Sequence, residues 1–514
     1  MSQRKESTFM KKTVIRCLLA VLALCTVLSA TVACQPETVT PTDTGNGETQ
    51  APDANYLFPD KIEIEDKELN ILNFEEYYNA IIFVDTDDYG DKISQTVYDR
   101  NAFFYDKYKV DVVEFRQGFV DGNKPFSYAT TRLQNAHNGG DDAFDVAYIS
   151  MNAQYSLVSQ GMMTDLRTVS TLELDAEYWD PQLSTSYILK DGRQYVASSP
   201  FHLMPYEMTW LIFFNQDMAE TRSVPDLFEY VRQGEWTVET MLKTVKDCGI
   251  ITENAEGGYT FDASGTATYG IALHSASSPK LLEGLDVKLF QEYDDEDLPY
   301  IFTCSDADAF AKANELLLQL FDRSMGMAIG SDYEDDLVNH PEGYVPVFHT
   351  NRALFLHAEI KSGMTLKKIL NSEVYYGMLP QPKLDTEQKG YYTTMSPNVI
   401  LFGIPTVCKE KEAVGTAADV LSYLSYRDLL PVYYDDYVSH RNASDQESLE
   451  MLNDYIMPGR RLDIGAVYGW ASTFTSNYAS LIYSQRSAGD TSLANIITST
   501  SKSINTKIRT FFKD

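Results

Sequence analysis

The chain alternates short apolar strands with amphipathic helices, and this alternation constrains its fold more than any other feature. Runs rich in Val, Ile, Leu and Phe predict strands at 69–74, 110–115 and 144–149. Apolar residues at helical spacing predict helices between them, at 94–109 and 130–136. Strands that alternate with helices form a mostly parallel sheet covered on both faces. The sequence therefore predicts an α/β fold, and the same alternation returns after residue 215.

The length of the chain predicts more than one hydrophobic core. It has 514 residues, whereas single cores stop growing beyond about 250–300 residues. We therefore expect two lobes. Beyond residue 34 the cysteines are Cys248, Cys304 and Cys408, too few and too scattered for a disulfide framework or a paired-cysteine motif. We expect three buried thiols and lobes stabilised by their cores.

The charge of the chain excludes two classes of partner. It carries 42 Lys and Arg against 74 Asp and Glu, a formal net charge of −32. A protein of this charge cannot release counterions from a phosphate backbone, so we expect no nucleic-acid binding. It is equally unsuited to binding anionic lipid through its surface, so any membrane association needs an anchor.

The first 33 residues have the pattern of an export signal. Lys11, Lys12 and Arg16 precede the apolar run Cys17–Leu28, which is too short to span a bilayer as a stable helix. The following Thr31-Val-Ala-Cys34 resembles a bacterial lipobox, which implies that Cys34 becomes an acylated N-terminus. The alternative is an ordinary secretory signal, residues 1–33, with Cys34 unmodified.

A polar segment follows Cys34. From residue 35 to 56 the chain consists mostly of Pro, Thr, Gly, Asn, Asp and Glu, with almost nothing to bury. Such a composition does not offset the entropy of ordering, so we expect residues 34–64 to be a disordered tether. A tether after an acylated cysteine would place the body outside the cytoplasm, anchored by lipid to the bacterial cell membrane.

An ordered series of short motifs runs through the rest of the chain. The series is Asp145-Val-Ala-Tyr148, Gly161, Thr164-Asp-Leu166, Tyr178-Trp-Asp-Pro181, Asp191-Gly-Arg-Gln-Tyr195, Thr209-Trp-Leu-Ile-Phe-Phe-Asn215, Gly234-Glu-Trp-Thr237, Tyr376-Gly-Met-Leu-Pro380 and Gly403-Ile-Pro405. In order and spacing it resembles the family 1 extracellular solute-binding proteins of bacterial ABC transporters, the maltose-binding protein class. The resemblance extends from about residue 65 to the end of the chain.

This resemblance implies a two-lobed periplasmic-binding-protein type II fold, in which each lobe has a mostly parallel sheet flanked by helices. It places lobe one at 65–214 and 399–452 and lobe two at 215–398 and 453–514, with the chain first crossing on Phe213-Phe-Asn215. It implies a monomeric binding protein without enzymatic activity, cofactor or metal. Its ligand would be a carbohydrate, held by hinge closure and delivered to the transmembrane subunits of an ABC permease.

The resemblance also suggests which residues face the ligand. Sugar hydroxyls bind carboxylate and amide groups, and sugar faces stack on aromatic rings. The expected ligand-binding residues are Asn73, Glu75, Glu76, Ser150, Asn152, Glu207, Trp210, Glu359 and Trp470. Glu75 and Glu76 could instead be solvated loop carboxylates.

Other candidate residues also have structural interpretations. Trp470 could belong to the core, and Ser150 or Asn152 could cap the helix after the third strand. Trp179 and Trp236 are expected to pack in the core, with Trp236 at the start of a helix. Asp191-Gly192 is a turn signal, which predicts a hairpin over 184–199.

Other kinds of chemistry find less support. Residues 85–91 superficially resemble a calcium loop, but Tyr89 and Thr96 stand where oxygen ligands belong, so a solvated turn is favoured. Glycoside hydrolysis needs two carboxylates at a set separation across the sugar. A high content of Asp and Glu does not by itself establish such a pair. The sequence has no zinc, phosphate-loop or nucleophile-elbow motif. Two alternatives stay open: a surface glycan-capture or sensory protein without a permease, and a non-sugar ligand such as a peptide or a phosphorylated metabolite. The acidity of the chain disfavours an anionic ligand, because the sequence shows no basic cluster that could form a local pocket.

Overall fold

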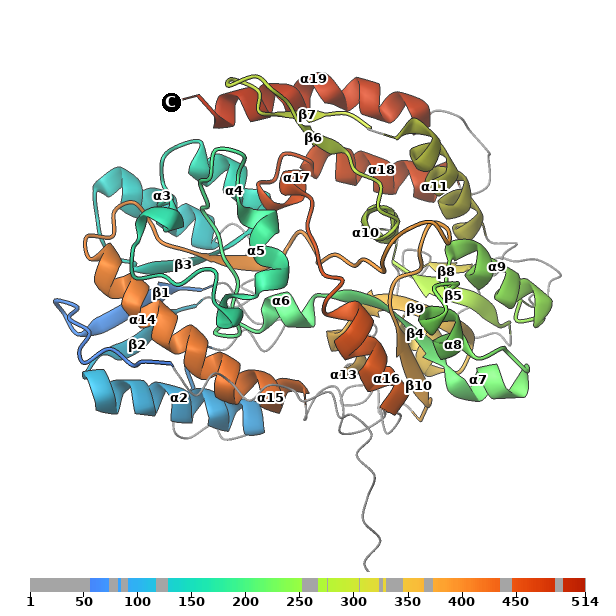
Figure 1. The fold of residues 1–514 in the computed structure, drawn as a ribbon, viewed down its shortest axis with the longest axis horizontal. Coiled ribbons are helices and arrows are strands. Elements are labelled where there is room, and N and C mark those ends of the chain that lie inside the picture. The colour runs from blue at the N-terminus through green and yellow to red at the C-terminus, as the bar shows by residue number, and fades with distance from the viewer. Residues whose placement is uncertain are drawn as a thin grey trace, which may run out of the picture. The chain divides into compact units, whose positions relative to one another are not determined.

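Two separate sheets form the framework of the chain (Figure 1). The structure is a computed structural model, and it describes residues 56–73, 82–84, 91–116, 128–251, 267–274, 276–304, 306–322, 327–329, 345–364, 373–434, 446–485 and 493–513. The strands are β1 (Glu68–Leu72), β2 (Asp111–Phe115), β3 (Val146–Ser150), β4 (Trp210–Asn215), β5 (Tyr269–Leu273), β6 (Phe290–Glu292), β7 (Tyr300–Phe302), β8 (Met327–Ile329), β9 (Ala353–Glu359), β10 (Tyr376–Leu379) and β11 (Ile400–Gly403).

The helices of the first half of the chain are α2 (Lys92–Tyr108), α3 (Tyr128–Gly139), α4 (Met151–Val158), α5 (Pro181–Tyr187), α6 (Met204–Glu207), α7 (Gln216–Thr221), α8 (Leu227–Arg232) and α9 (Val238–Asp247). Those of the second half are α10 (Ser277–Gly284), α11 (Ala307–Leu320), α12 (Val345–His349), α13 (Lys361–Met364), α14 (Lys411–Leu424), α15 (Leu430–Tyr433), α16 (Gln446–Glu450), α17 (Ile464–Val467), α18 (Ser472–Gln485) and α19 (Leu493–Phe511).

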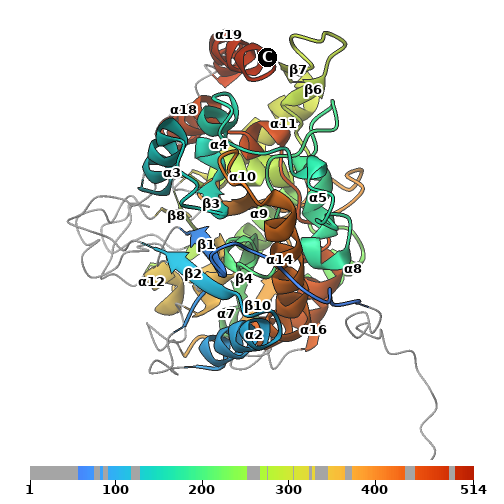
Figure 2. The ribbon, with the colours of Figure 1, turned by 90° about the vertical axis from the view of Figure 1, so that its left-hand side faces the viewer.

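The four-stranded sheet has the strand order β11-β3-β1-β2. β1 is parallel to β2 and to β3, and β11 joins from far along the chain as an antiparallel edge strand. The helices α3 and α4 contact β3, whereas α2 contacts β2 and α14 (Figure 2). Because helices cover both faces, all five residues of β3 are buried. The three predicted strands and two predicted helices of this region are confirmed, with ends shifted by a few residues.

The five-stranded sheet has the order β10-β4-β9-β5-β8. β5 is parallel to β8 and β9, while β4 is antiparallel to β9 and β10, so this sheet is mixed. Every residue of β4, β5 and β9 is buried. The predicted α/β class, with parallel pairing and flanking helices in both sheets, is confirmed.

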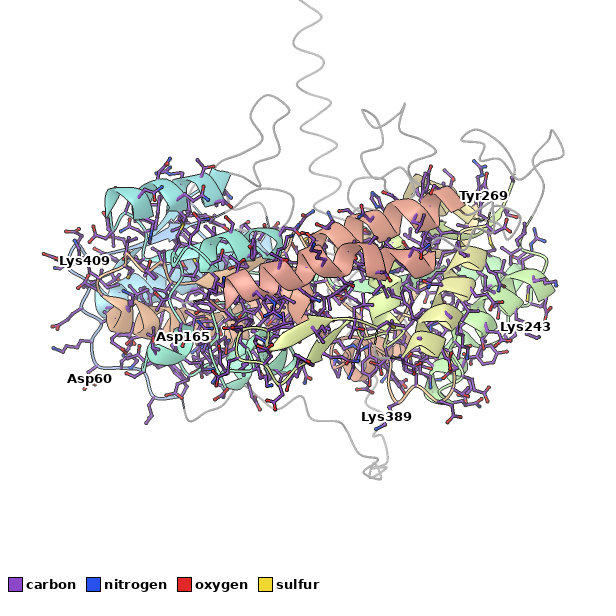
Figure 3. All side chains as sticks on the ribbon, turned by 90° about the horizontal axis from the view of Figure 1, so that it is seen from above. Asp60, Asp165, Lys243, Tyr269, Lys389 and Lys409 are labelled. Carbon is purple, nitrogen blue, oxygen red and sulfur yellow. The ribbon has the colours of Figure 1, made fainter. Side chains whose placement is uncertain are left out.

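The two longest C-terminal helices lie side by side, as Figure 3 shows in red tones. α18 packs on α10 and α11, which belong with the five-stranded sheet, while α19 packs on α4 of the other half and on β7. The end of the chain therefore contacts elements of both halves.

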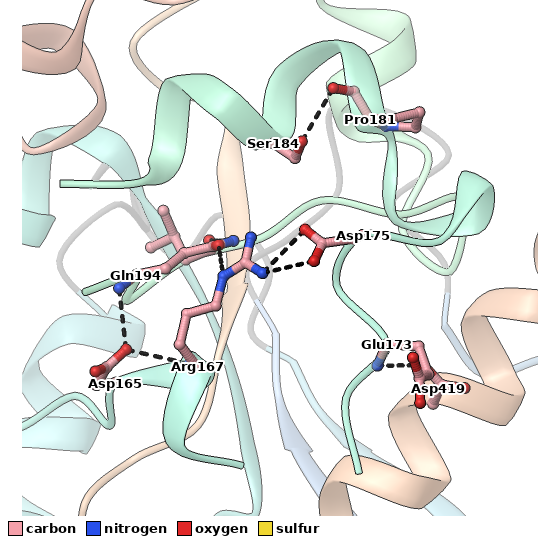
Figure 4. A network of polar contacts seen from close by, with 9 residues as sticks. Asp165, Arg167, Glu173, Asp175, Pro181, Ser184, Gln194 and Asp419 are labelled. Atoms are coloured by element: carbon pink, nitrogen blue, oxygen red, sulfur yellow. Dashed lines mark hydrogen bonds and ion pairs between the residues drawn. The ribbon is translucent and has the colours of Figure 1, made fainter. Parts of the chain in front are cut away.

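A polar network explains the spacing of two of the sequence motifs (Figure 4). Asp165 Oδ1 accepts hydrogen bonds from the backbone N–H groups of Arg167 and Gln194, at 3.1 and 3.0 Å. Arg167 then donates to Gln194 Oε1 at 2.9 Å and to both carboxylate oxygens of Asp175. The motifs around residues 165 and 194 are thus held together by their own side chains.

Two core tryptophans lie where the sequence predicts them. Trp179 is 1% exposed and donates to Asp419 Oδ1, and Trp236 is fully buried and donates to the carbonyl of Pro380. Trp236 directly precedes Thr237, whose side chain caps α9.

The predicted hairpin over 184–199 is correct only around its turn. Leu189 N donates to the carbonyl of Arg193 at 2.9 Å, and Gly192 between them has a φ of +87°. Residues 184–187, however, belong to the helix α5. The second half pairs with β11 instead, through a bridge between Ala197 and Phe402. The expectation of three buried thiols also fails in part, because Cys408 is buried whereas Cys248 and Cys304 are half-buried.

A buried ion pair lies beneath α5. Asp180 and Arg460 have side chains only 2% and 4% exposed, and Arg460 Nη2 donates to Asp180 Oδ1 at 2.7 Å. Asp180 also accepts from Ser198 Oγ at 3.4 Å. Because neither charge can reach water, each depends on the other for its stabilisation.

We expect Asp180→Asn to lower the free energy of unfolding by about 3–5 kcal/mol, since it leaves a buried guanidinium without its counter-charge. Urea denaturation would measure this loss. The matched control is Asp175→Asn, whose carboxylate is 82% exposed and pairs with Arg167; it should cost at most about 1 kcal/mol. Equal losses of unfolding free energy in the two variants would show that the buried ion pair stabilises the fold no more than the exposed one.

Candidate functional site

Among the described residues, three chain segments run between the two sheets and contact one another. The segment before β4 bridges the segment before β11 through the antiparallel pair Thr209 and Met395. The latter segment bridges the chain before α17 through the parallel pair Thr393 and Arg460. Trp210 N donates to the carbonyl of Thr394 at 3.1 Å, which extends the first contact. Figure 1 shows α6 and these segments between the two sheets.

The crossings differ in place from the expected ones. β4, which includes Phe213-Phe-Asn215, already belongs to the five-stranded sheet, so the first crossing precedes it. The stretch Gln446–Glu450 packs on β10 of that sheet, so the chain has already passed to the five-stranded half before the boundary expected at 452. The division of the chain into lobes stays a prediction. These contacts indicate which residues belong with each sheet.

Asn73 follows β1 and uses both ends of its side-chain amide within the protein. Its Nδ2 donates to Glu114 Oε1, and its Oδ1 lies 3.1 Å from His202 Nε2. Burial raises the pKa of Glu114. Burial, with a smaller effect of Arg100, lowers the pKa of His202 to about 3, so this ring is neutral at pH 7. This arrangement makes Asn73 part of an internal network rather than an open ligand contact.

Ser150 and Asn152 lie at the carboxyl end of β3, where α4 begins. Ser150 is the residue before α4, but its side chain makes no capping hydrogen bond. Asn152 is exposed, and its Nδ2 donates to Asn398 Oδ1 at 3.2 Å. Asn398 follows the second crossing segment, so Asn152 lies next to that crossing and is accessible to a ligand.

Trp210 and Glu359 are direct partners across β4 and β9. They are 3% and 8% exposed, and Glu359 Oε2 lies 3.7 Å from Lys361 Nζ. The Trp210 ring lies 4.5 Å from Lys280 Nζ and 4.6 Å from the ring of His357. Sequence reasoning missed Lys280 and His357, because neither lies in a motif and both reach Trp210 only through the sheet.

Glu207 and Trp470 are both buried, in different surroundings. Glu207 is 1% exposed and ends α6, on the first crossing segment. Trp470 is fully buried, and its ring lies 5.1 to 6.1 Å from the rings of five aromatic residues. These residues are Phe290, Tyr300, Tyr468, Phe511 and Phe512. This packing favours the core interpretation of Trp470 over a ligand platform.

Glu75 and Glu76 lie outside the described residues, as do Asp85–Gly90 of the loop compared with a calcium site.

The second crossing segment also carries a titrating contact. Thr394 Oγ1 donates to Glu283 Oε2 at 2.6 Å. Burial raises the pKa of Glu283 to about 7, against the opposing effect of this hydrogen bond. The crossing thus touches a carboxyl group that changes its charge near neutral pH.

The described part of the chain holds no group of three or more His, Cys, Asp or Glu side chains placed to bind a metal ion. Among the same residues, no helix is both long and apolar enough to cross a membrane. A hollow of about 500 Å³ lies beside α3 and is lined in part by Asn135 and Phe144. Phe144 precedes β3, so this hollow is at the opposite end of the strand from Ser150.

We expect Trp470→Ala to lower the free energy of unfolding by about 3–5 kcal/mol, because it leaves a cavity among aromatic rings. The affinity of the folded variant for the ligand should be unchanged. Denaturation and calorimetric titration would measure the two effects separately. A stable variant that has lost its affinity would return Trp470 to the binding site.

Comparison with known proteins identifies the fold. No family model and no curated protein sequence matches the chain. Solved structures do match. A cyclo/maltodextrin-binding protein complexed with maltotetraose aligns at 12% identity and a TM-score of 0.54, over 86% of this chain and 98% of that one. The galacto-N-biose-/lacto-N-biose I-binding protein of the ABC transporter from Bifidobacterium longum aligns at 11% identity and a TM-score of 0.54, over 86% and 97%.

A third match is to UgpB from Mycobacterium tuberculosis in complex with glycerophosphocholine, at 12% identity and a TM-score of 0.52, over 86% of this chain and 98% of that one. All three are binding proteins or ligand complexes, and this chain spans nearly their whole length. The chain therefore has the fold of the two-lobed solute-binding proteins of the maltose-binding protein class, as its motifs predicted.

Proposed function

We propose that this protein captures a carbohydrate, specifically an oligosaccharide, and delivers it to an ABC importer. The observation that supports the proposal most is the set of three crossing segments joining two α/β sheets. Two of the three structures described above hold a saccharide or belong to a saccharide-binding protein. The protein would act as a receptor, and ATP hydrolysis would belong to its partner.

The mechanism we propose is hinge closure. The crossing segments pair with one another through isolated bridges rather than through a sheet, so we propose that they bend while the two sheets move as rigid bodies. A ligand that contacts both lobes favours the closed form through its differential affinity. The permease would then recognise the closed form, and no covalent step is needed.

The polar residues near the crossings suit saccharide hydroxyls. Asn152 offers an amide from the four-stranded half, and Glu359 offers a carboxylate from the five-stranded half. Glu207, on the first crossing, supplies a second carboxylate, and Trp210 supplies the aromatic surface expected at such sites. These contacts are our proposal for the binding residues.

A thermal-shift screen of the purified protein against oligosaccharides, with peptides and amino acids as controls, tests the ligand class. A ligand at 100 times its Kd should add about 2.7 kcal/mol of stability. With the ligand found, Asn152→Ala should weaken binding by about 2- to 12-fold, the effect of one net hydrogen bond. Asn135→Ala, an exposed asparagine on α3, should leave it unchanged. A shift with peptides alone would overturn the carbohydrate proposal.

We also propose that Cys34 carries the lipid anchor. Cys34→Ser should move the protein from the membrane fraction to the soluble fraction and abolish labelling with radioactive palmitate. Cys25→Ser, within the apolar run of the signal, is the matched control and should change neither result. Retention of the label in Cys34→Ser would exclude this cysteine as the attachment site.

A further inference from the structure

Lys280 carries a buried charge that the protein leaves mostly unpaired. It lies on α10 and is 8% exposed. Its Nζ donates one hydrogen bond, to the carbonyl of Ala276 at 2.9 Å, and lies over the ring of Trp210. Among the described residues no carboxylate forms an ion pair with it. An ammonium has three donors, so at least one strong acceptor is missing here.

Other buried polar groups lie on β4, α10 and β9, the elements that carry Trp210, Lys280 and His357. Within the described part of the chain, Trp210 Nε1, Ser278 Oγ and both ring nitrogens of His357 have no hydrogen-bond partner. Their residues are 3%, 0% and 0% exposed. Indole and ammonium groups can only donate, and the serine hydroxyl can donate as well. We call Lys280, Trp210, Ser278 and His357 the donor cluster.

The neighbouring carboxylates are engaged elsewhere. Glu359 pairs with Lys361, and Asp286 pairs with Arg461 at 2.8 Å. Glu283 accepts from Thr394. The donor cluster also borders the first turn of α10, whose preceding residue Ala276 makes no side-chain cap, and the N-terminal end of a helix favours negative charge.

The chain next to the donor cluster reaches the surface at the end of β5. His274, directly after this strand, is exposed. Its backbone N–H donates to Ser277 Oγ at 3.1 Å, at the beginning of α10. The donor cluster therefore lies one helical turn from the surface.

We propose that the donor cluster binds an anionic oxygen group of the ligand, a carboxylate or a phosphate, so that the captured saccharide is an acidic one. This inference rests on the proposed function and names its substrate class. A neutral hydroxyl would supply an acceptor but no charge, and it would need an acceptor of its own. An anion accepts hydrogen bonds from ammonium, indole and hydroxyl donors alike, and it brings the charge that the ammonium lacks.

The donor cluster also sets the pH dependence of binding. Burial lowers the pKa of Lys280 to about 8, although Glu359 and Glu283 act to raise it. The other titratable groups that face Lys280, His357 and His274, are neutral at and above pH 7. An anion binds the protonated lysine, so affinity should fall as pH rises through 8, by up to tenfold per pH unit. Ionisation of Glu283 near pH 7 acts in the same direction.

Matched ligand pairs test this inference on the unaltered protein. An oligogalacturonate is compared with its methyl ester, and glucose 6-phosphate with glucose, by calorimetric titration at pH 7 and pH 9.5. We expect one acidic member to bind about 10- to 100-fold more tightly than its neutral partner. This preference should shrink at pH 9.5. Which pair shows it distinguishes carboxylate from phosphate.

Variants then connect the preference to the donor cluster. Lys280→Gln should abolish the preference for the acidic member, whereas Lys312→Gln, an exposed lysine on α11 paired with Asp385, should retain it. Equal binding within both pairs, or a preference that survives Lys280→Gln, would overturn the inference. Neutral oligosaccharides that bind without any acidic preference would leave the proposed function intact. Binding of inorganic phosphate through Lys280, with no saccharide bound, would support the donor cluster and overturn the carbohydrate proposal.

Discussion

Arg460 is the residue on which the arrangement of the crossing segments depends. It lies on the third segment, and its backbone bridges Thr393 on the second. Its guanidinium lies 4.9 Å from the ring of Tyr206, near the first segment, and pairs with Asp180 beneath α5. A single residue thus contacts all three segments, the second through its backbone and the first through its buried guanidinium. In the hinge closure that we propose, Arg460 would hold the crossings in place.

The five-stranded half buries polar groups next to the crossing segments, and this burial lowers the stability of the fold. Burying donors without acceptors destabilises a protein by about 1–3 kcal/mol for each neutral group, and the five-stranded half buries Trp210 Nε1, Ser278 Oγ and the His357 ring in this state. In the four-stranded half, Asp419 accepts from Tyr56, Tyr178, Trp179 and the backbone of Glu173. Among the described residues of that half, Tyr148 Oη and Gln154 Oε1 are also buried without a partner, so unpartnered groups alone do not mark a binding site. What distinguishes the donor cluster is the buried ammonium of Lys280 beside such groups.

Much of the fold could be predicted from the sequence, because it depends on local pattern. The apolar run of β3 and the amphipathic pattern of α2 locate these elements to within a few residues. The hairpin over 184–199 failed beyond its turn because the turn at Gly192 is local, whereas the partner of Ala197 is Phe402, two hundred residues away. The core position of Trp470 was open for the same reason: its burial depends on Phe290 and Phe511, which only the fold brings near it.

The motifs that predicted the fold are mostly those that hold it together. Asp165 and Gln194 bind each other, Trp179 binds Asp419, and Trp236 binds a backbone carbonyl. Such residues identify a fold because the fold needs them, and their side chains are used within the protein.

Lys280 lies in no motif, and the acidic composition of the chain argued against an anionic ligand for lack of a basic cluster. The donor cluster draws on three separate segments, β4, α10 and β9, so only the folded chain brings it together. Trp210 belongs to a motif, but the proposed charge of the site comes from Lys280, which has no sequence signature. Structures of this fold hold maltotetraose in one case and glycerophosphocholine in another, so the fold alone does not determine the ligand.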